Sequence, residues 1–263
     1  MTELEFAKKT CLQAGRLLKQ TFASGGVRAS PKGRNDIVTQ ADKASQEMIF
    51  NAIRKQFPGD ALLGEESFNG NIPRHERLWV VDPLDGTVNY EAGLPFYCTS
   101  IALANSTASY QPIVGAVYAP VLEELYAAEK GKGAFLNGKA IRASQRPLRE
   151  GLVSITMSKD RENMLASTQA MRELHSKVRR FRSIGSIAIE SCGVASGRFA
   201  AMFNPGGKPW DSAAANLIIS EAGGCYSDCR GEPWTLESTG IAAANAQENL
   251  KAITNAIGKH LKH

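Results

Sequence analysis

The order of apolar and polar positions in the first half of the chain predicts two helices followed by a series of strands. Residues 3 to 22 carry apolar side chains at helical spacing, and the pattern ends before two adjacent glycines. A second helical pattern covers 41–57 and is stopped by Pro58 and Gly59. Short apolar runs then predict strands at 61–64, 78–81, 98–104, 113–118, 125–128 and 134–136, with Asn137 and Gly138 forming a hairpin turn.

The second half of the chain alternates between strand-like and helix-like patterns. The predicted strands are 152–157, 178–181, 198–203 and 241–244. The predicted helices are 161–175, a buried helix of small residues at 184–195, 211–222, and a terminal helix at 247–261. This alternation favours a layered α/β or α+β protein. We interpret residues 1–263 as a single domain with an α+β half up to residue 150 and an α/β half from residue 151.

Composition narrows the class of protein. The 263 residues are 43% hydrophobic and 22% charged, which allows an extensive core. No apolar run is long enough to span a bilayer and the first residues lack the pattern of a signal peptide, so we expect a cytoplasmic protein with no membrane partner. The odd count of five cysteines indicates free thiols.

The net charge of +5 is diffuse except for one basic segment, Lys177–Arg182. We interpret this segment as a solvated strand edge, with a basic flank that attracts an anionic substrate as the alternative. Nucleic-acid binding is not expected, because no nucleic-acid motif accompanies the charge.

Acidic residues follow one of the predicted strands. The apolar run that begins at Trp79 ends at Asp82, Pro83 cannot donate a ladder hydrogen bond, and Gly86 permits a sharp turn, so we expect the strand to stop abruptly there. Asp82 and Asp85 would then converge at the strand end, where open α/β sheets bind ligands. Crowded carboxylates repel one another unless a cation joins them, which predicts a divalent-metal site, and oxygen ligands favour Mg²⁺ over zinc.

Other polar residues could complete such a site. Free N–H groups of Gly86 and Thr87 would form an anion-binding corner at a helix start. Glu65 and Glu66 follow a predicted strand, although a pair of glutamates alone favours an exposed loop. Asp211 could be a simple helix N-cap, yet the small residues after it would let the helix pack closely and bring this carboxylate deep.

Asp42 also has two interpretations. It could support the start of the second helix, or it could orient a water molecule as half of a Thr/Asp pair. The four histidines are scattered along the chain, which leaves little material for a zinc site or a histidine-based nucleophile.

Two motif matches are rejected. Residues 133–139 have the spacing of a phosphate-binding P-loop, but Ala140 stands where serine or threonine is required. The run from Asp82 to Thr87 is similar to the Asp-x-Asp-Gly-Thr motif of haloacid dehalogenases, but it has one residue too many for the nucleophile and proton donor of that family.

Taken together, the motifs resemble those of the inositol monophosphatase family of Mg²⁺-dependent, lithium-sensitive phosphomonoesterases. The matching segments occur in family order and are Asp36–Asp42, Gly64–Ser67, Trp79–Tyr90, Gly185–Ser186 and Pro209–Gly224. The resemblance implies a layered α-β-α-β-α sandwich of the sugar-phosphatase type, a homodimer, and a small phosphorylated substrate.

The resemblance also implies metal ligands. Glu65, Asp82 and the backbone carbonyl of Leu84 would hold a first Mg²⁺, and Asp82, Asp85 and Asp211 a second. A third ion would rest on Glu65 and water, so that each site would hold two to three ions.

The same resemblance implies roles for the remaining site residues. Asp42 and Thr87, with Glu65, would be the catalytic residues, and the first two would orient a metal-bound water for attack on phosphorus. The residues implied in binding phosphate or substrate are Asp85, Gly86, Thr87, Gly185, Ser186, Asn204 and Asp211.

One position departs from the family pattern and leaves the substrate open. Enzymes that prefer inositol phosphate usually carry glutamate where this chain has Asn204, which brings no charge. Inositol monophosphate is the first expectation. The alternatives are fructose 1,6-bisphosphate, histidinol phosphate and 3′-phosphoadenosine 5′-phosphate, and a regulatory, RNA-polymerase-associated binding protein on the same fold is an alternative of another class.

Overall fold

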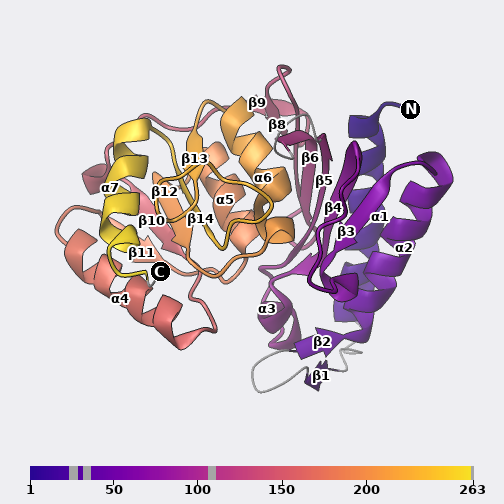
Figure 1. Ribbon diagram of the computed structural model, residues 1–263, viewed down its shortest axis with the longest axis horizontal. Coiled ribbons are helices and arrows are strands. Elements are labelled where there is room, and N and C mark those ends of the chain that lie inside the picture. Colours follow the sequence, from indigo (N-terminus) through magenta and orange to yellow (C-terminus); the bar gives the residue numbers. More distant parts are fainter. Residues whose placement is uncertain (24–28, 32–36, 106–110, 262–263) are drawn as a thin grey trace.

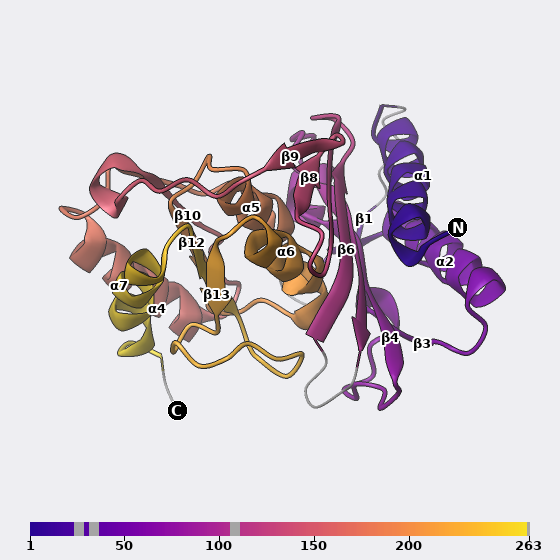
Figure 2. The same cartoon turned by 90° about the horizontal axis from the view of Figure 1, so that it is seen from above.

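The computed structural model describes residues 1–23, 29–31, 37–105 and 111–261. Helices and sheets alternate in five layers (Figure 1), and the view from above shows the same succession (Figure 2). An outer pair of helices covers a seven-stranded sheet, a central pair separates it from a five-stranded sheet, and a third pair closes the other side. This arrangement confirms the α-β-α-β-α sandwich.

The helix pairs lie close to where the apolar periodicity predicts them. The outer pair is α1 (Glu3–Ala23) and α2 (Gln40–Gln56), the central pair is α5 (Ile187–Ala195) and α6 (Pro209–Glu221), and the third pair is α4 (Arg161–Leu174) and α7 (Gln247–Gly258). The predicted helix at 184–195 begins three residues late, because Gly185 has a φ of +84° and forms a turn before α5.

The seven-stranded sheet follows chain order from β3 to β9. Its strands are β3 (Ala61–Gly64), β4 (Arg77–Asp85), β5 (Cys98–Asn105), β6 (Gln111–Ala119), β7 (Glu124–Glu129), β8 (Ala134–Leu136) and β9 (Lys139–Ile141). Only the β3–β4 pair is parallel. Asn137 and Gly138 have φ values of 49° and 78° and form the predicted hairpin turn between β8 and β9. Strands β1 (Ala29–Pro31) and β2 (Ile37–Thr39) pair antiparallel in a separate two-stranded sheet.

The five-stranded sheet has the order β11-β10-β12-β14-β13. Its strands are β10 (Leu152–Ile155), β11 (Arg180–Arg182), β12 (Ala201–Asn204), β13 (Cys225–Ser227) and β14 (Ile241–Ala244). The pairs of β10 with β11 and β12 are parallel, and the other two pairs are antiparallel. Strand β11 lies at an edge with its arginines exposed, which agrees with the interpretation of the basic segment as a solvated strand edge.

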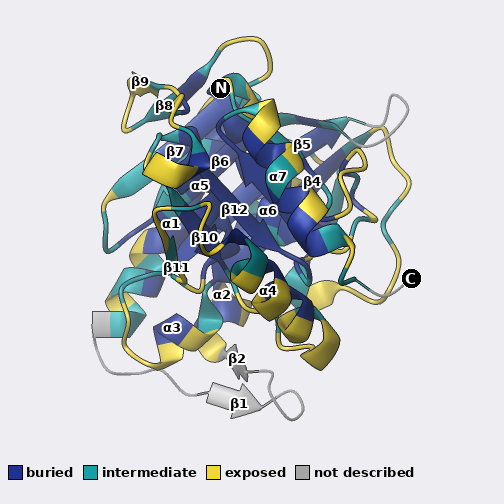
Figure 3. Ribbon diagram, turned by 90° about the vertical axis from the view of Figure 1, so that its left-hand side faces the viewer, coloured by how far each residue is buried: buried dark blue, intermediate teal, exposed yellow. Residues whose placement is uncertain are grey.

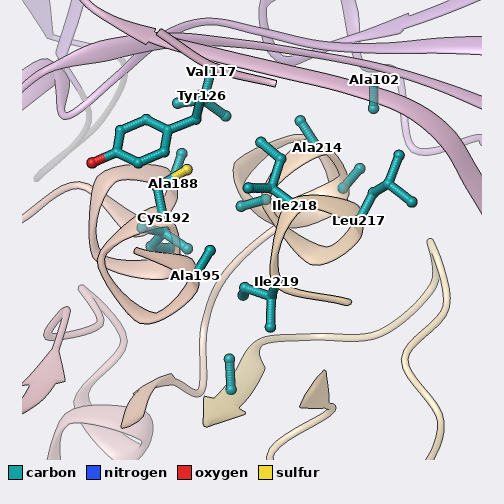
Figure 4. Close-up of a cluster of buried hydrophobic side chains, with 14 of the residues drawn as sticks. Ala102, Val117, Tyr126, Ala188, Cys192, Ala195, Ala214, Leu217, Ile218 and Ile219 are labelled. Atoms are coloured by element: carbon teal, nitrogen blue, oxygen red, sulfur yellow. The ribbon is translucent and has the colours of Figure 1, made fainter. Parts of the chain in front are cut away.

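The core fills the spaces between the layers. In the central layer, side chains of α5 and α6 pack against Val117 and Tyr126 of the seven-stranded sheet (Figure 4). Helix α6 lies so close to the sheet that a Cβ on Gly115 of β6 would be 2.6 Å from the carbonyl oxygen of Ala214. Trimming a large core residue of this layer such as Ile218 to alanine would cost about 2–5 kcal/mol. In the third pair, helices α4 and α7 turn buried faces towards the five-stranded sheet and exposed faces outward (Figure 3).

The expected abrupt end of the strand at Asp82 is wrong. Strand β4 continues to Asp85, and its pairing with β5 shifts register between Asp82 and Asp85 before it resumes opposite Cys98. Pro83 fits because it sits in this irregularity. Its carbonyl oxygen accepts hydrogen bonds from the hydroxyls of Ser45 and Thr99, each at 3.1 Å. The strand therefore bends instead of stopping.

The structure also bears on the expected absence of membrane-spanning helices and on the state of the cysteines. Within the described part of the chain, none of the helices combines the length and the apolar character that crossing a bilayer would require. All five cysteines are free thiols, as the odd count indicates.

Candidate metal centre

The bend of β4 places two aspartates and a carbonyl group within four residues. Asp82 is 1% exposed, and its Oδ1 accepts the backbone N–H of Leu84 at 3.0 Å. Asp85, at 8% exposed, ends the strand. A local Asp turn of this kind fixes the backbone around Pro83 and leaves both carboxylates at one end of the sheet.

Gly86 redirects the chain directly after Asp85. Its φ of +87° lies in the left-handed region, and a Cβ there would come within 2.6 Å of the carbonyl oxygen of Phe96. It is the N-cap of the short helix α3 (Thr87–Glu91), which lies at the lower end of the layers in Figure 1. The Thr87 hydroxyl donates to the Leu84 carbonyl at 3.0 Å. Only glycine permits this reversal without strain, so Gly86 determines where Thr87 lies.

Asp85 is held by the start of another helix, α5. Its Oδ2 accepts the Ser186 hydroxyl at 2.5 Å and the Ala188 N–H at 2.8 Å, and its Oδ1 accepts the Ile187 N–H at 3.3 Å. The Cys98 thiol lies 3.6 Å from the same Oδ2. Burial raises the pKa of Asp85, although these hydrogen bonds and the positive end of the helix dipole oppose the shift.

Asp211 is fixed within its own helix, α6. It is the third helical residue, and Lys208 occupies the N-cap, so the expectation that Asp211 itself could be the cap is corrected. Its Oδ2 accepts the Lys208 backbone N–H at 2.8 Å, and Pro209 occupies the first helical position. The side chain is partly buried, and burial, then Asp85 and Glu65, hold its pKa well above the usual range.

Glu65 follows the edge strand β3, and Asp42 belongs to the outer helix α2. Glu65 opens a single 3₁₀ turn, Glu65–Ser67, directly after β3 and is partly exposed. The turn is anchored by Gln46 of α2, whose Oε1 accepts the Glu66 N–H at 2.9 Å. Asp42 lies in the first turn of α2 and is almost fully buried. Asp36, also part of the matching segments, lies outside the described residues.

Electrostatics connect these carboxylates. The pKa of Asp82 lies well above the usual range because of burial first, and then because of the negative charges of Glu65, Asp85, Asp211 and Asp42. Like charges disfavour the ionised form of a carboxylate, so the repulsion acts in the same direction as the burial. A cation among them would offset both the burial and the repulsion. The donors are all oxygen atoms, so the chemistry of this set fits Mg²⁺.

The acidic residues are not drawn into a compact cluster. Within residues 1–23, 29–31, 37–105 and 111–261, no three side chains of histidine, cysteine, aspartate or glutamate converge closely enough to enclose one ion. Asp82, Asp85 and Asp211 all bond protein N–H groups. The assignment of individual ligands to two or three ions therefore stays a prediction.

Two residues expected to bind substrate are engaged with the protein. Ser186 is fully buried, and its Oγ both donates to Asp85 and accepts the N–H of Ile189 at 3.3 Å as the N-cap of α5. Asn204 is 2% exposed, its Nδ2 donates to the Thr156 carbonyl at 2.7 Å, and its Oδ1 accepts the Gly206 N–H at 2.8 Å. Both side chains are therefore hydrogen bonded within the protein.

Several residues around the site were missing from the sequence prediction. Asn89 donates to the carbonyls of Phe96 and Ile184, each at 2.8 Å, and joins α3 to the turn before α5. Glu190 and Gln46 bond turns beside the site. For Glu190 a signal existed, since it is the one charged residue in an otherwise small and apolar helix. For Asn89 and Gln46 no local pattern distinguishes them from surface amides.

Comparisons with known proteins agree with this picture. The model of the inositol monophosphatase family matches residues 2–262. Inositol monophosphatase 2 of Solanum lycopersicum is 40% identical over 265 residues, covering 97% of this chain and 96% of that protein. The Nus factor SuhB of Escherichia coli strain K12 is 35% identical, covering 92% of this chain and 91% of that protein. The Thermotoga maritima IMPase structure superposes with a TM-score of 0.86 at 32% identity, covering 99% of this chain and 100% of that chain.

Proposed function

Because this chain belongs to the inositol monophosphatase family, we propose that it is a Mg²⁺-dependent phosphatase of small phosphomonoesters, with inositol monophosphate as the first candidate substrate. The observation that carries the proposal is the bend of β4, which brings the buried carboxylates of Asp82 and Asp85 and the Leu84 carbonyl within four residues at one end of the strand. The names of the tomato relatives support the choice of substrate.

In this proposal, Glu65, Asp82, Asp85, Asp211 and the Leu84 carbonyl hold two to three ions. Bound there, Mg²⁺ supplies the positive charge that neutralises the phosphate and lowers the pKa of the attacking water. The protein's part is to keep oxygen ligands at fixed places, through the bend of β4 and the starts of α5 and α6.

The chain's own groups would guide the attack. Asp42 would accept a hydrogen bond from the attacking water, and Thr87 would help to orient it through its hydroxyl, which is now 3.0 Å from the Leu84 carbonyl. The N–H groups of Gly86 and Thr87 would contact the phosphate. No residue forms a covalent bond to phosphorus in this scheme.

The buried position of Asn204 bears on the substrate. Because its amide is hydrogen bonded within the protein, the ring hydroxyls of a sugar or inositol would need other partners. Fructose 1,6-bisphosphate, histidinol phosphate and 3′-phosphoadenosine 5′-phosphate therefore stay as alternatives. We also propose lithium inhibition and a homodimer, on the family resemblance alone.

A panel assay tests the proposal. Phosphate release from these four substrates is measured while Mg²⁺ is titrated and lithium is added. We expect Mg²⁺-dependent release with inositol monophosphate, and its loss in Asp82→Asn. Release that persists without divalent metal, or that Asp82→Asn leaves unchanged, would refute the metal mechanism. No release from any substrate would favour a regulatory binding protein, as the name of the Nus factor relative suggests.

A further inference from the structure

We propose that Glu190, a residue outside the predicted site, is a positioning residue that holds Asp85 and Asp211 in register with each other. The proposal rests on the proposed function, because it takes these two aspartates as ligands of one metal centre. Glu190 contacts neither of them. It acts through the turn before α5 on one side and through Thr156 and Asn204 on the other.

Glu190 is a buried carboxyl group surrounded by hydrogen-bond donors. The residue is completely buried, in a helix whose residues are otherwise small or apolar. Its Oε1 accepts the N–H groups of Ile184 at 2.6 Å and Gly185 at 3.1 Å, and its Oε2 accepts the Thr156 hydroxyl at 2.5 Å. Burying a carboxyl group is costly unless such partners surround it. A hydrophobic residue would fill this helix position at lower cost, so the contribution of the acid lies in the groups that it bonds.

Glu190 fixes the turn at Ile184 and Gly185 that precedes α5. Gly185 adopts a φ of +84°, and a Cβ there would come within 3.1 Å of the Asn89 amide nitrogen. Glu190 binds the N–H groups of the turn, while Asn89 binds its Ile184 carbonyl at 2.8 Å. The turn is thus held from two directions and cannot shift without breaking one of these hydrogen bonds.

The turn before α5 positions three hydrogen-bond donors beside Asp85. Ser186 follows directly, and its hydroxyl and the next two N–H groups donate to the Asp85 carboxylate, alongside the weak Cys98 thiol of β5. The first three donors move with the start of α5. Partners of this kind orient a metal ligand, and their loss typically weakens metal binding 10- to 100-fold.

The other carboxylate oxygen of Glu190, Oε2, is linked to Asp211 through Thr156 and Asn204. The Thr156 carbonyl accepts the Asn204 amide at 2.7 Å, and Asn204 in turn accepts the Gly206 N–H at 2.8 Å. Two residues later, the Lys208 N–H donates to Asp211 at 2.8 Å. A continuous path of hydrogen bonds and short chain segments therefore runs from Asp85 through Glu190 to Asp211, and it gives Asn204 a structural role.

The test compares Mn²⁺ binding, measured by electron paramagnetic resonance on the full chain, in wild type, Glu190→Ala and Glu190→Gln. We expect Glu190→Ala to weaken Mn²⁺ binding at least about 10-fold, as for other groups that orient metal ligands. Glu190→Gln can accept from the turn through its oxygen and donate to Thr156 through its nitrogen, so it should restore most of the affinity.

Asn249→Ala is the matched control. Asn249 is a buried amide in α7 that donates to the Arg146 carbonyl at 3.1 Å and to Asn245 at 2.6 Å, away from the acidic residues. It should lower the melting temperature without changing Mn²⁺ affinity. If Glu190→Ala does the same, its role is structural only and the proposal is overturned.

Thr156→Val and Thr156→Ser serve if Glu190→Ala does not fold. Valine removes only the hydroxyl that bonds Glu190, so it should weaken Mn²⁺ binding while serine retains it; equal affinities would overturn the proposal. Failure of the wild-type protein to bind Mn²⁺ would instead overturn the proposed function, and this inference with it.

Discussion

The starts of α5 and α6 support Asp85 and Asp211, two ligands of the proposed metal site, in different ways. Asp211 belongs to α6 and is fixed by the N–H of Lys208, three residues earlier in the chain. Asp85 belongs to β4, yet its partners are the first residues of α5, 101 to 103 positions away. One carboxylate is placed by local capping and the other by tertiary packing. A site built in this way depends on the relative position of two helices, and both helices lie in the central layer.

This difference predicts which substitutions have the largest effect. Asp85→Asn and Asp211→Asn should each lower phosphate release at least about 100-fold, because a metal ligand contributes several kcal/mol to the transition state. If both carboxylates serve one centre, the double variant should be scarcely worse than the more damaging single variant, since residues that act as a unit are not additive. The measurement is kcat/KM for the best substrate of the panel.

Asp160→Asn is the control for this comparison, since Asp160 caps α4 by accepting the Asn163 N–H at 2.9 Å and asparagine retains that role. It should leave kcat/KM unchanged. Effects of Asp85→Asn and Asp211→Asn that simply multiply in the double variant would show that the two aspartates do not share a centre.

A second pair of variants distinguishes a carboxylate held by a side-chain hydroxyl from one held by a backbone N–H group. Ser186→Ala removes a hydroxyl that bonds a carboxylate and caps α5, which should cost about 1.5–3 kcal/mol of stability and also weaken metal binding. Lys208→Ala keeps the backbone N–H that bonds Asp211, so its effect on both quantities should be small. Thermal unfolding and Mn²⁺ titration measure the two effects.

Ser196→Ala is the matched control for Ser186. It removes a hydroxyl from the other end of α5, where Ser196 donates to the Cys192 carbonyl at 2.9 Å, and should leave metal affinity unchanged. A Lys208→Ala variant as impaired in metal binding as Ser186→Ala would remove the distinction between the two helix starts.

The smallest effect is expected at Cys98. Its thiol is a weak donor 3.6 Å from Asp85. Cys98→Ser keeps a donor at this place and should change stability by only about 1 kcal/mol, with little change in kcat/KM. Cys11→Ser, a second buried thiol, bonded to backbone carbonyls instead, is the comparison. A large loss of activity in Cys98→Ser alone would show that support for Asp85 is more finely tuned than its strong donors indicate.

The same contrast explains how much could be predicted from the sequence. Helix α2 and strand β14 follow from local apolar patterns, and the layered fold followed from their alternation and the family resemblance. Strands β9 and β13 have three residues each, too few to show a period, and they form because a neighbouring strand supplies hydrogen bonds. The continuation of β4 past Pro83 likewise depends on its pairing with β5.

The candidate site divides in the same way. The acidic residues are visible as a motif, and Asp211 follows the rules of a helix start. The support of Asp85 by Ser186, and the hydrogen bond of the buried Asn204 amide to the Thr156 carbonyl, depend on contacts across the fold. No pattern in the surrounding residues predicts them. The resemblance names the candidate ligands, and the structure adds which elements hold them.

The most direct test of the account is calorimetric titration of Mg²⁺ into the wild-type protein and into Asp82→Asn, with Asp160→Asn as the control. Asp82 is almost fully buried and is a ligand of both principal ions in the proposed site, so we predict that wild type and Asp160→Asn bind Mg²⁺ alike, and that Asp82→Asn loses at least about 10-fold in affinity because it removes a ligand and a charge. Equal Mg²⁺ binding by all three proteins, or binding by none of them, would contradict the account.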